Sequence, residues 1–443
     1  MKNLQKTDSE IYRLIKAEEK RQAETLMMIP SENIASRAVE EAVGSCLGNK
    51  YAEGYAGKRY YQGQQVVDQV ETLVIDRAKK LFGVEAVNVQ PLSGSPANFA
   101  VYTALLQPGD TLMGLGLAHG GHLTHGAAFN ASSKYFRSVP YVLNEKGYID
   151  HDALEKQAVK EKPAIIIAGV TAYPRRVDWK KFAAIADKVG AYLMADIAHL
   201  AGLIAAGVYP SPVPYVHIVT TTTHKTLRGP RGAMIMVTAK GLKKDPELEN
   251  KINKAIIPGI QGGPHLNTIA GIGVALKEAS SKKFVRYSEQ ILKNASVLAE
   301  ELKANNMQLV SGGTDSHLLL VDLRNHNILG NTAAEGCEAA RIVLNRNGVP
   351  FDPNPPFYPS GIRLGTPGLT SRGMKEAQMR QIARFISRVV KGLQATKEKL
   401  GYSMEDEKKK SVRMEIVSKT KEVNEVAKEI KRLCLRFPIP KSY

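Results

Sequence analysis

The residues most able to do chemistry in this chain are a histidine and a lysine, His224 and Lys225, at the end of a β-branched stretch. Ile218–Thr222 is apolar and then rich in threonine, which is typical of a buried strand. The pair leads into a turn of glycine, proline and arginine, Leu227–Gly232. A lysine at the C-terminal end of a strand lies where open α/β sheets bind ligands, and its amine can form a Schiff base with a carbonyl compound. An ordinary surface lysine is the alternative.

A second candidate is the small-residue segment Ser93–Ser95, which follows a short strand expected at 86–90 and precedes a helix expected to begin at Ala97. Small residues let backbone N–H groups approach an anion, and the start of a helix adds partial positive charge. Gly94 and Ser95 could therefore bind a phosphate, although the same residues are common in a plain turn.

Asp196 directly follows the apolar run Ala191–Ala195 and stands three residues before His199. A carboxylate at the end of a central strand is costly to bury without a partner, and a protonated pyridine nitrogen would be such a partner. A helix-capping aspartate beside an incidental histidine is the alternative. A phosphate loop, a strand-end acid and the strand-end Lys225 are, in that order, what pyridoxal phosphate requires.

Two further segments carry suitable polar groups. His119–Gly126 places three imidazoles in a glycine-rich loop. A metal site there would lack an acidic or cysteine partner, so an imidazole stacked on a cofactor ring is the simpler interpretation. Arg363 lies between glycines in Ser360–Thr366, where a guanidinium could bind a substrate carboxylate through two hydrogen bonds. A lone arginine is more often part of a surface ion pair.

The elements expected around these residues alternate between strand and helix. Continuous apolar runs at 165–168 and 191–195 are typical of strands buried on both faces of a parallel sheet, with a helix at 179–189 between them. Strands at 218–222 and 233–237 complete an α/β domain. The later part of the chain is expected to be α+β, with a strand at 318–322 and helices at roughly 267–305, 332–347 and 373–397.

The composition of the 443 residues, 43% hydrophobic and 23% charged, is that of a soluble globular protein. A formal net charge of +18 raises a nucleic-acid hypothesis, but the basic residues are dispersed and their longest run is Lys408–Lys410. We therefore do not expect a nucleic-acid partner. Three distant cysteines, no apolar leader in Met1–Asp8 and no run of membrane-spanning length favour a cytoplasmic protein without a membrane partner.

Over nearly its whole length the chain resembles serine hydroxymethyltransferase. The segments that carry the resemblance are long and occur in the family's order: Tyr51–Tyr61, Asn88–Asn98, Leu117–Gly126, Asp196–Gly207, Val219–Gly232, Pro258–Pro264, Ser311–His317 and Ser360–Pro367. Leu92 departs from the family pattern, in which His or Tyr is frequent at that position.

The resemblance implies the α/β fold of pyridoxal-phosphate-dependent transferases of the aspartate-aminotransferase superfamily. A large domain would hold a mostly parallel seven-stranded sheet flanked by helices, and a smaller C-terminal domain would be α+β. The expected division is a helical arm at 1–50, the large domain at 51–270, and the small domain with a helical tail at 271–443.

The implied activity is the interconversion of serine and glycine, with the one-carbon unit moved to or from tetrahydrofolate and a side activity on 3-hydroxy amino acids. The implied assembly is a homodimer, or a tetramer, with active sites shared between chains. A threonine-aldolase-like enzyme that does not use folate is one alternative. A basic RNA-binding protein is a second and weaker one.

The resemblance also implies roles for single residues. Lys225 would bind the aldehyde of pyridoxal phosphate, Asp196 would pair with its ring nitrogen, and Arg363 with Ser31 would bind the amino-acid carboxylate. Glu53 would transfer protons at the substrate hydroxymethyl group or at the folate. The remaining cofactor contacts would be His122 stacked on the ring and touching substrate, His199 near the ring hydroxyl, Thr171 near O3′, and Gly94, Ser95 and His224 on the phosphate.

Other implied contacts belong to the partner subunit and to folate. The residues supplied by the partner subunit would be Tyr51, Glu53, Tyr61, Gly262 and Gly263, with Tyr51 and Gly263 reaching the phosphate. Folate would contact Leu117, Gly121, Leu123, Tyr60 and Asn347, with Phe357 nearby.

Overall fold

The computed structural model describes residues 1–440, and these form two compact units. The larger unit comprises residues 35–292, and the smaller unit comprises residues 1–34 together with the described residues from 293 onward. One reason for the first boundary is that Val43 packs against Gly271, so the segment after residue 34 belongs with the larger unit. The three-part division into domains at 1–50, 51–270 and 271–443 stays a prediction.

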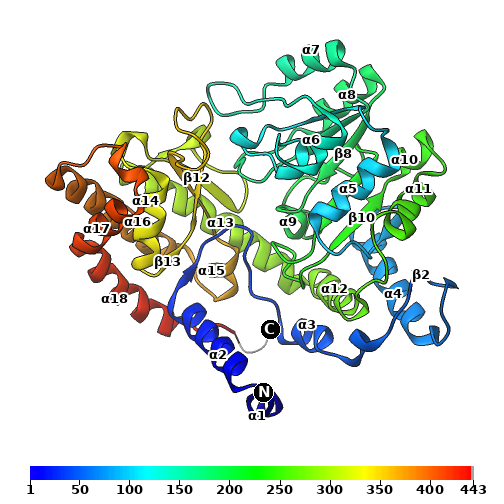
Figure 1. The fold of residues 1–443 in the computed structure, drawn as a ribbon, viewed down its shortest axis with the longest axis horizontal. Helices are drawn as coiled ribbons and strands as arrows, with labels where there is room; N and C mark the ends of the chain where they lie inside the picture. Colours follow the sequence, from blue (N-terminus) through cyan, green and yellow to red (C-terminus); the bar gives the residue numbers. More distant parts are fainter. Residues whose placement is uncertain (441–443) are drawn as a thin grey trace. The chain divides into compact units, whose positions relative to one another are not determined.

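A seven-stranded sheet forms the centre of the larger unit (Figure 1). Its strands, in spatial order, are β4 (Ala86–Asn88), β10 (Ala233–Val237), β9 (Ile218–Thr222), β8 (Tyr192–Asp196), β7 (Ile165–Gly169), β5 (Thr111–Gly114) and β6 (Arg137–Ser138). The pairs from β9 to β6 are all parallel, while β10 is antiparallel to both of its neighbours. The mostly parallel sheet confirms the predicted fold class.

Alternation along each strand divides the core between the two faces of this sheet. On β7, Ile166 and Ala168 lie in one apolar cluster, and Ile165 and Ile167 lie in another. Because neighbouring side chains of a strand point to opposite faces, a strand buried on both faces must be apolar throughout. The helices that contribute to the first cluster are α4 (Gln65–Phe82), α7 (His151–Glu161), α8 (Trp179–Val189), α9 (Ala201–Ala205), α12 (Leu266–Ala279) and the start of α13 (Lys282–Ala304). Those of the second cluster are α5 (Gly94–Leu105) and α11 (Leu248–Lys254).

Two predicted helix boundaries in or next to the larger unit were wrong. Helix α5 begins at Gly94 rather than at Ala97. Pro96 is compatible with that start, because the N–H groups of the first helical turn have no partner within the helix. The helix expected over 267–305 is two helices, α12 and α13 (Lys282–Ala304). They are separated near Ser281, whose hydroxyl accepts a hydrogen bond from the Phe284 N–H and so starts the second helix.

The smaller unit contains an antiparallel four-stranded sheet. Its order is β11 (Gln308–Leu309), β12 (Leu318–Asp322), β15 (Gly361–Gly365) and β14 (Asn345–Asn347). A parallel pair joins β1 (Leu26–Met27) to β13 (Ile342–Val343). The helices around them are α2 (Ser9–Glu24), α14 (Gly330–Ala339), α15 (Pro367–Ser371), α16 (Glu376–Leu400), α17 (Lys410–Lys419) and α18 (Lys421–Arg436).

The helix predicted near 332–347 was therefore wrong in its second half. Helix α14 ends at Ala339, and Arg341 has a left-handed φ of 68°, which turns the chain into the β-branched pair Ile342–Val343. That pair forms hydrogen bonds with β1, a partner more than 300 residues earlier that no local pattern reveals. The other elements are α1 (Lys2–Thr7), α3 (Arg37–Val43), β2 (Gly54–Tyr55), β3 (Lys58–Arg59), α6 (Ala131–Tyr135) and α10 (Ala239–Lys244).

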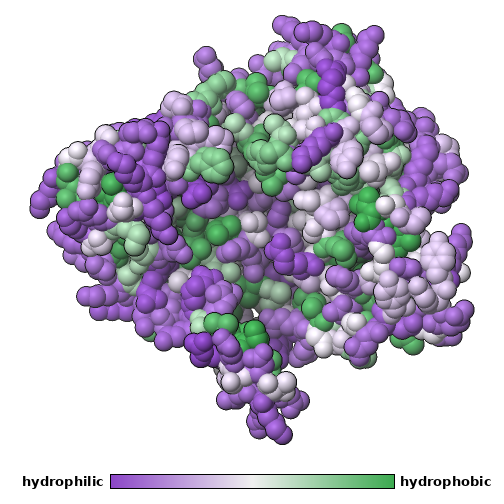
Figure 2. All heavy atoms as spheres, viewed as in Figure 1, coloured by the Kyte–Doolittle hydropathy of each residue, from purple (hydrophilic) through white to green (hydrophobic). Residues whose placement is uncertain are grey.

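The surface is mixed in character. On the face drawn in Figure 2, hydrophilic side chains predominate, with hydrophobic patches between them. Within residues 1–440 we find no helix that combines the length and the apolar character needed to span a bilayer.

Candidate active site

Three parallel strands of the larger unit end side by side at the residues that the sequence singled out. The register pairs Gly169 at the end of β7 with Asp196 at the end of β8, and Asp196 with Thr220 on β9. Lys225 follows β9 by three residues. The acid and the lysine turn therefore lie at the carboxyl edge of the sheet, where ligands bind in α/β folds.

Asp196 is buried at this edge, with 8% of its surface exposed, and is held by two side chains. Its Oδ2 accepts hydrogen bonds from Asn98 Nδ2 at 2.8 Å and from His125 Nε2 at 3.0 Å. Thr220 in turn donates to Asn98 Oδ1 at 2.7 Å. Burial alone raises the pKa of Asp196, but the hydrogen bonds that its carboxylate accepts from His125 and Asn98 lower it below the ordinary carboxyl value. Asp196 is thus a buried carboxylate, suited to hold a cationic ring nitrogen.

The orientation of His125 is fixed from its other side. The backbone N–H of His122 donates to His125 Nδ1 at 3.2 Å, which makes Nδ1 an acceptor and places the ring proton on Nε2, facing Asp196. Gly169 makes room for this contact, because a Cβ there would lie 2.6 Å from His125 Cε1 and 2.8 Å from Asp196 Cβ. Sequence reasoning missed His125 and Asn98 as functional residues. Only the three-histidine loop hinted at the first, and no signal marked the second.

The predicted phosphate loop lies against the end of β9. A Cβ on Gly94 would stand 2.8 Å from Thr222 Cγ2, so glycine at this position allows the first turn of α5 to approach the strand that leads to Lys225. Ser95 is the next residue of the same turn. The structure therefore brings the predicted phosphate-binding residues and the lysine turn together.

The turn that carries His224 and Lys225 is tied to the segment after Asp196. Thr226 Oγ1 donates to the His199 carbonyl at 2.9 Å and accepts from the Gly202 N–H at 3.0 Å. His224 Nδ1 is buried and has no hydrogen-bond partner among the described residues. Burial, together with the charges of Lys225 and Arg231, lowers the pKa of His224 to about 3, so its ring is neutral at pH 7 and can still donate one hydrogen bond.

The loop of His122 and the segment after β7 meet through the backbone. The N–H of Thr171 donates to the Gly120 carbonyl at 2.7 Å, and His122 Nδ1 is 2.8 Å from Thr124 Oγ1. Thr124 also accepts from Asn98 Nδ2 at 2.8 Å, which links this loop to Asp196. Of the residues expected to contact folate here, Leu117 and Leu123 are exposed.

A second cluster gathers residues that the resemblance assigned to a partner-facing surface. Tyr51 Oη donates to Glu53 Oε1 at 3.0 Å, and the rings of Tyr51 and Tyr61 meet edge to face with centroids 5.3 Å apart. The loop containing Gly262 and Gly263 lies against them, because a Cβ on Gly263 would be 3.0 Å from the Tyr51 ring. Tyr51, Tyr60 and Tyr61 are all exposed.

The remaining predicted residues lie in the smaller unit. Arg363 is central in β15 and 92% buried by residue surface, and its Nε donates to Asn345 Oδ1 at 3.1 Å. Burial lowers the pKa of Arg363 to about 10, which leaves the guanidinium charged at neutral pH. Ser31 follows Pro30, which packs on Gly365 of the same strand. Asn347 ends β14, and Phe357 is exposed with its carbonyl bonded to Asn331.

Comparison with known proteins identifies the family of this chain. The sequence model of the family "Serine hydroxymethyltransferase" matches residues 4–386. The chain belongs to the serine hydroxymethyltransferase family. A protein of that name from Desulfotalea psychrophila is 52% identical over 440 residues, covering 99% of this chain and 96% of its own length.

Two further serine hydroxymethyltransferases show the same relation. The one from Endomicrobium trichonymphae is 50% identical over 440 residues, covering 99% of each chain. The one from Acidothermus cellulolyticus is 56% identical over 384 residues, covering 86% of this chain and 88% of its own. Family membership confirms the predicted enzyme class and the predicted serine–glycine interconversion with tetrahydrofolate. The folate-independent aldolase and the RNA-binding protein find no support.

Proposed function

We propose that this serine hydroxymethyltransferase works with pyridoxal phosphate bound at the carboxyl edge of the seven-stranded sheet. The proposal depends on the state of Asp196. This carboxylate is buried beside the turn of Lys225, and hydrogen bonds from His125 and Asn98 keep it ionised. A buried carboxylate of this kind is costly unless it serves a cationic partner.

The residues at this edge fit pyridoxal phosphate in three respects. Asp196 suits a protonated ring nitrogen. The first turn of α5, opened by Gly94, suits a phosphate, since it presents backbone N–H groups and the positive end of a helix. His224 Nδ1, buried and without a partner among residues 1–440, is a donor available to the same phosphate.

Each side chain then has a definite task. Lys225 binds the cofactor aldehyde through its amine, and Asp196 keeps the ring nitrogen protonated. His122 would stack on the ring, His199 and Thr171 would lie near its hydroxyl, and Ser95 with His224 would bind the phosphate. When bound, pyridoxal phosphate supplies a ring that accepts the electron pair released at the substrate α carbon.

Arg363 and Ser31 bind the amino-acid carboxylate and so orient the substrate bond to be broken. A buried, charged guanidinium suits this task, because low local polarity strengthens a paired hydrogen bond to a carboxylate. Glu53 accepts or returns the proton at the hydroxymethyl oxygen, assisted by Tyr61. Tetrahydrofolate takes the one-carbon unit and contacts Leu117, Gly121, Leu123, Tyr60, Asn347 and Phe357.

The assembly proposed for this reaction is a cytoplasmic homodimer. Tyr51, Glu53, Tyr61, Gly262 and Gly263 form one cluster on the larger unit, and its two tyrosines are exposed. Exposed tyrosines gathered around a carboxylate suit a surface that serves the site of a second chain, since aromatic side chains are enriched in protein interfaces.

A visible absorption spectrum tests the proposal. The purified protein should show a yellow cofactor band, and a new long-wavelength band should appear only when glycine and tetrahydrofolate are both present. Lys225→Ala should abolish the lysine–cofactor adduct that borohydride traps in the parent protein. A band that responds to glycine but never to tetrahydrofolate would refute the folate part, and no band after added pyridoxal phosphate would refute the cofactor assignment.

A further inference from the structure

One arginine binds the backbone on both sides of Glu53. Nη1 of Arg59 donates to the carbonyl of Ala52 at 2.9 Å and to that of Gly54 at 2.7 Å. The carbonyl of Glu53 itself accepts from the backbone N–H of Tyr60 at 3.1 Å. The peptide groups that set the direction of the Glu53 side chain are therefore all held by residues 59 and 60.

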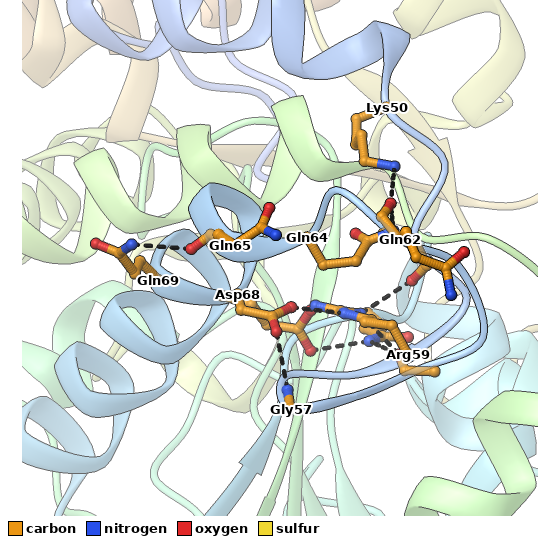
Figure 3. Close-up of polar contacts among 12 residues, drawn as sticks. Lys50, Gly57, Arg59, Gln62, Gln64, Gln65, Asp68 and Gln69 are labelled. Carbon is orange, nitrogen blue, oxygen red and sulfur yellow. Dashed lines mark hydrogen bonds and ion pairs between the residues drawn. The ribbon is translucent and has the colours of Figure 1, made fainter.

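The residue before this stretch is held as well. The carbonyl of Tyr51 accepts from Lys50 Nζ at 3.1 Å and from Gln64 Nε2 at 3.0 Å, and both donors also bond to the carbonyl of Gln62. Figure 3 shows Lys50 reaching Gln62 above the turn that contains Arg59. Four consecutive carbonyls, from residue 51 to residue 54, thus accept side-chain or backbone hydrogen bonds.

The guanidinium is itself fixed by two acids of helix α4. Arg59 Nε donates to Asp68 Oδ1 at 2.9 Å and Nη2 donates to Glu71 Oε2 at 2.5 Å. The Arg59 and Glu71 side chains are only 3% and 1% exposed. Asp68 also accepts from the N–H of Gly57, so the acid pins the turn between β2 and β3 (Figure 3).

A residue next to the central sheet adds two hydrogen bonds to this network. Gln90, two residues after β4, donates from Nε2 to Glu71 Oε1 at 2.8 Å and to the Gly54 carbonyl at 3.0 Å. Only a guanidinium has enough donors, in a planar fork, to serve two carboxylates and two carbonyls at once. A lysine keeps the charge but not this geometry.

We propose that Arg59 is a positioning residue that acts through Glu53. It ties residues 51–54 to helix α4, and so holds the Glu53 carboxyl and Tyr51 Oη in one orientation before substrate arrives. The inference rests on the proton-transfer role proposed for Glu53, and it deepens that role by naming the group that keeps the carboxyl in place.

A double-mutant cycle in the holoenzyme tests this. Arg59→Lys should lower kcat for serine with tetrahydrofolate by about tenfold or more while KM for serine changes little, because misplacing a reacting group by about 1 Å can cost about 100-fold. In the Glu53→Gln background the same substitution should have no further effect on kcat. Equal losses in both backgrounds would overturn the inference. Arg137→Lys, on an exposed arginine paired with Glu161, is the matched control and should leave kcat unchanged.

Hydrogen exchange gives a readout that does not depend on activity. The amides of residues 54–60 should exchange faster in Arg59→Lys than in the parent, and unchanged exchange would overturn the inference. If Arg59→Lys does not fold, Asp68→Asn replaces it, since it removes one carboxylate and leaves the arginine. It should show the same pattern to a smaller degree, and normal exchange with normal kcat would again refute the idea.

The failure of this inference can be told apart from failure of the proposed function. If Glu53→Gln is fully active, the role proposed for Glu53 fails, and the claim that Arg59 acts through it fails with it. If Glu53→Gln is slow while Arg59→Lys has normal kcat and exchange, only the inference about Arg59 fails.

Discussion

At the scale of single residues, the site depends on an acid that stays ionised although it is buried. Asp196 would be neutral in an apolar surrounding, and it is His125, with its proton directed by the His122 backbone, that reverses this tendency. His125 touches Asp196 rather than any group proposed to react. It is a positioning residue, and we expect its loss to act by raising the pKa of Asp196.

The first prediction concerns pH. The pKa of Asp196 is depressed in the folded protein, so its ionised form persists as pH falls until that lowered pKa is reached. His125→Ala should raise the pKa of Asp196 and so shift the acid limit of cofactor retention to higher pH. The visible band of bound pyridoxal phosphate, followed from pH 8 downward, measures this.

A matched control is His151→Ala. This variant also removes an imidazole, but His151 is the first residue of α7 and its ring packs against Phe182 of α8. It should leave the acid limit of the parent protein unchanged. An identical acid limit in His125→Ala and the parent would contradict the role given to His125.

At the scale of elements, the site exists because the first turn of α5 can touch the end of β9. The contact between Gly94 and the Thr222 methyl group leaves no space for a Cβ at position 94. Two helices of the smaller unit are joined instead by hydrogen bonds from one arginine. In the smaller unit, Arg372 donates to carbonyls at the C-terminal ends of two helices. These are the carbonyls of Ala23 and Thr25 at the end of α2 and those of Cys434 and Phe437 at the end of α18.

The second prediction tests the contact of α5 with β9. Gly94→Ala should push the helix from the strand and weaken retention of pyridoxal phosphate by about tenfold, the effect of roughly 1.4 kcal/mol from overpacking. Adding Thr222→Ser removes the methyl group that the new Cβ meets and should restore most of the affinity, as measured by cofactor titration. Gly48→Ala, where a Cβ would meet nothing closer than 3.6 Å, should have no effect.

The third prediction tests the arginine between α2 and α18. Arg372→Ala removes a buried cation and leaves several carbonyls without a donor, so it should lower the free energy of unfolding by roughly 3 kcal/mol. Urea denaturation measures the loss. Arg388→Ala, which breaks only exposed pairs with Glu425 and Glu429, should stay within about 0.5 kcal/mol of the parent. Equal effects of the two substitutions would refute the role of Arg372.

At the scale of the whole molecule, the proposed reaction divides its residues between chains. Lys225 and Asp196 belong to the same carboxyl edge of one sheet, whereas Glu53 lies in a cluster with the exposed Tyr51 and Tyr61. A closed twofold assembly would let each chain supply its cluster to the other chain's site.

The fourth prediction follows from this sharing. Lys225→Ala and Glu53→Gln chains, each defective alone, should regain activity when they are unfolded together and refolded as a mixture. Random pairing makes half of the dimers hybrid, and one of the two sites in each hybrid is intact, so about a quarter of the parent activity is expected.

Its control mixes Lys225→Ala with Asp196→Asn, two defects of the same sheet edge, and should regain nothing. Recovery in the control mixture, or none in the first, would refute sharing. Light scattering on the refolded samples distinguishes a dimer from a tetramer.

Most of the residues proposed to do the chemistry could be located from sequence because they stand next to strongly patterned strands. Asp196 ends an apolar run, Lys225 follows a β-branched strand by three residues, and Gly94 opens a helix after another strand, so local pattern alone locates them. The strands and the helix between them are predicted for the same reason. A strand buried on both faces must be continuously apolar, and few other structures require that.

Tertiary structure alone decided what surrounds them. His125 and Asn98 reach Asp196 across 71 and 98 residues of chain, and the pairing of β13 with β1 spans more than 300. Hydrogen bonds of this kind depend on which elements become neighbours in space. The periodicity of a short segment does not reveal those neighbours. The sequence by itself therefore determined which residues are proposed to hold the reactive groups, while the fold decided their protonation, their direction and their partners.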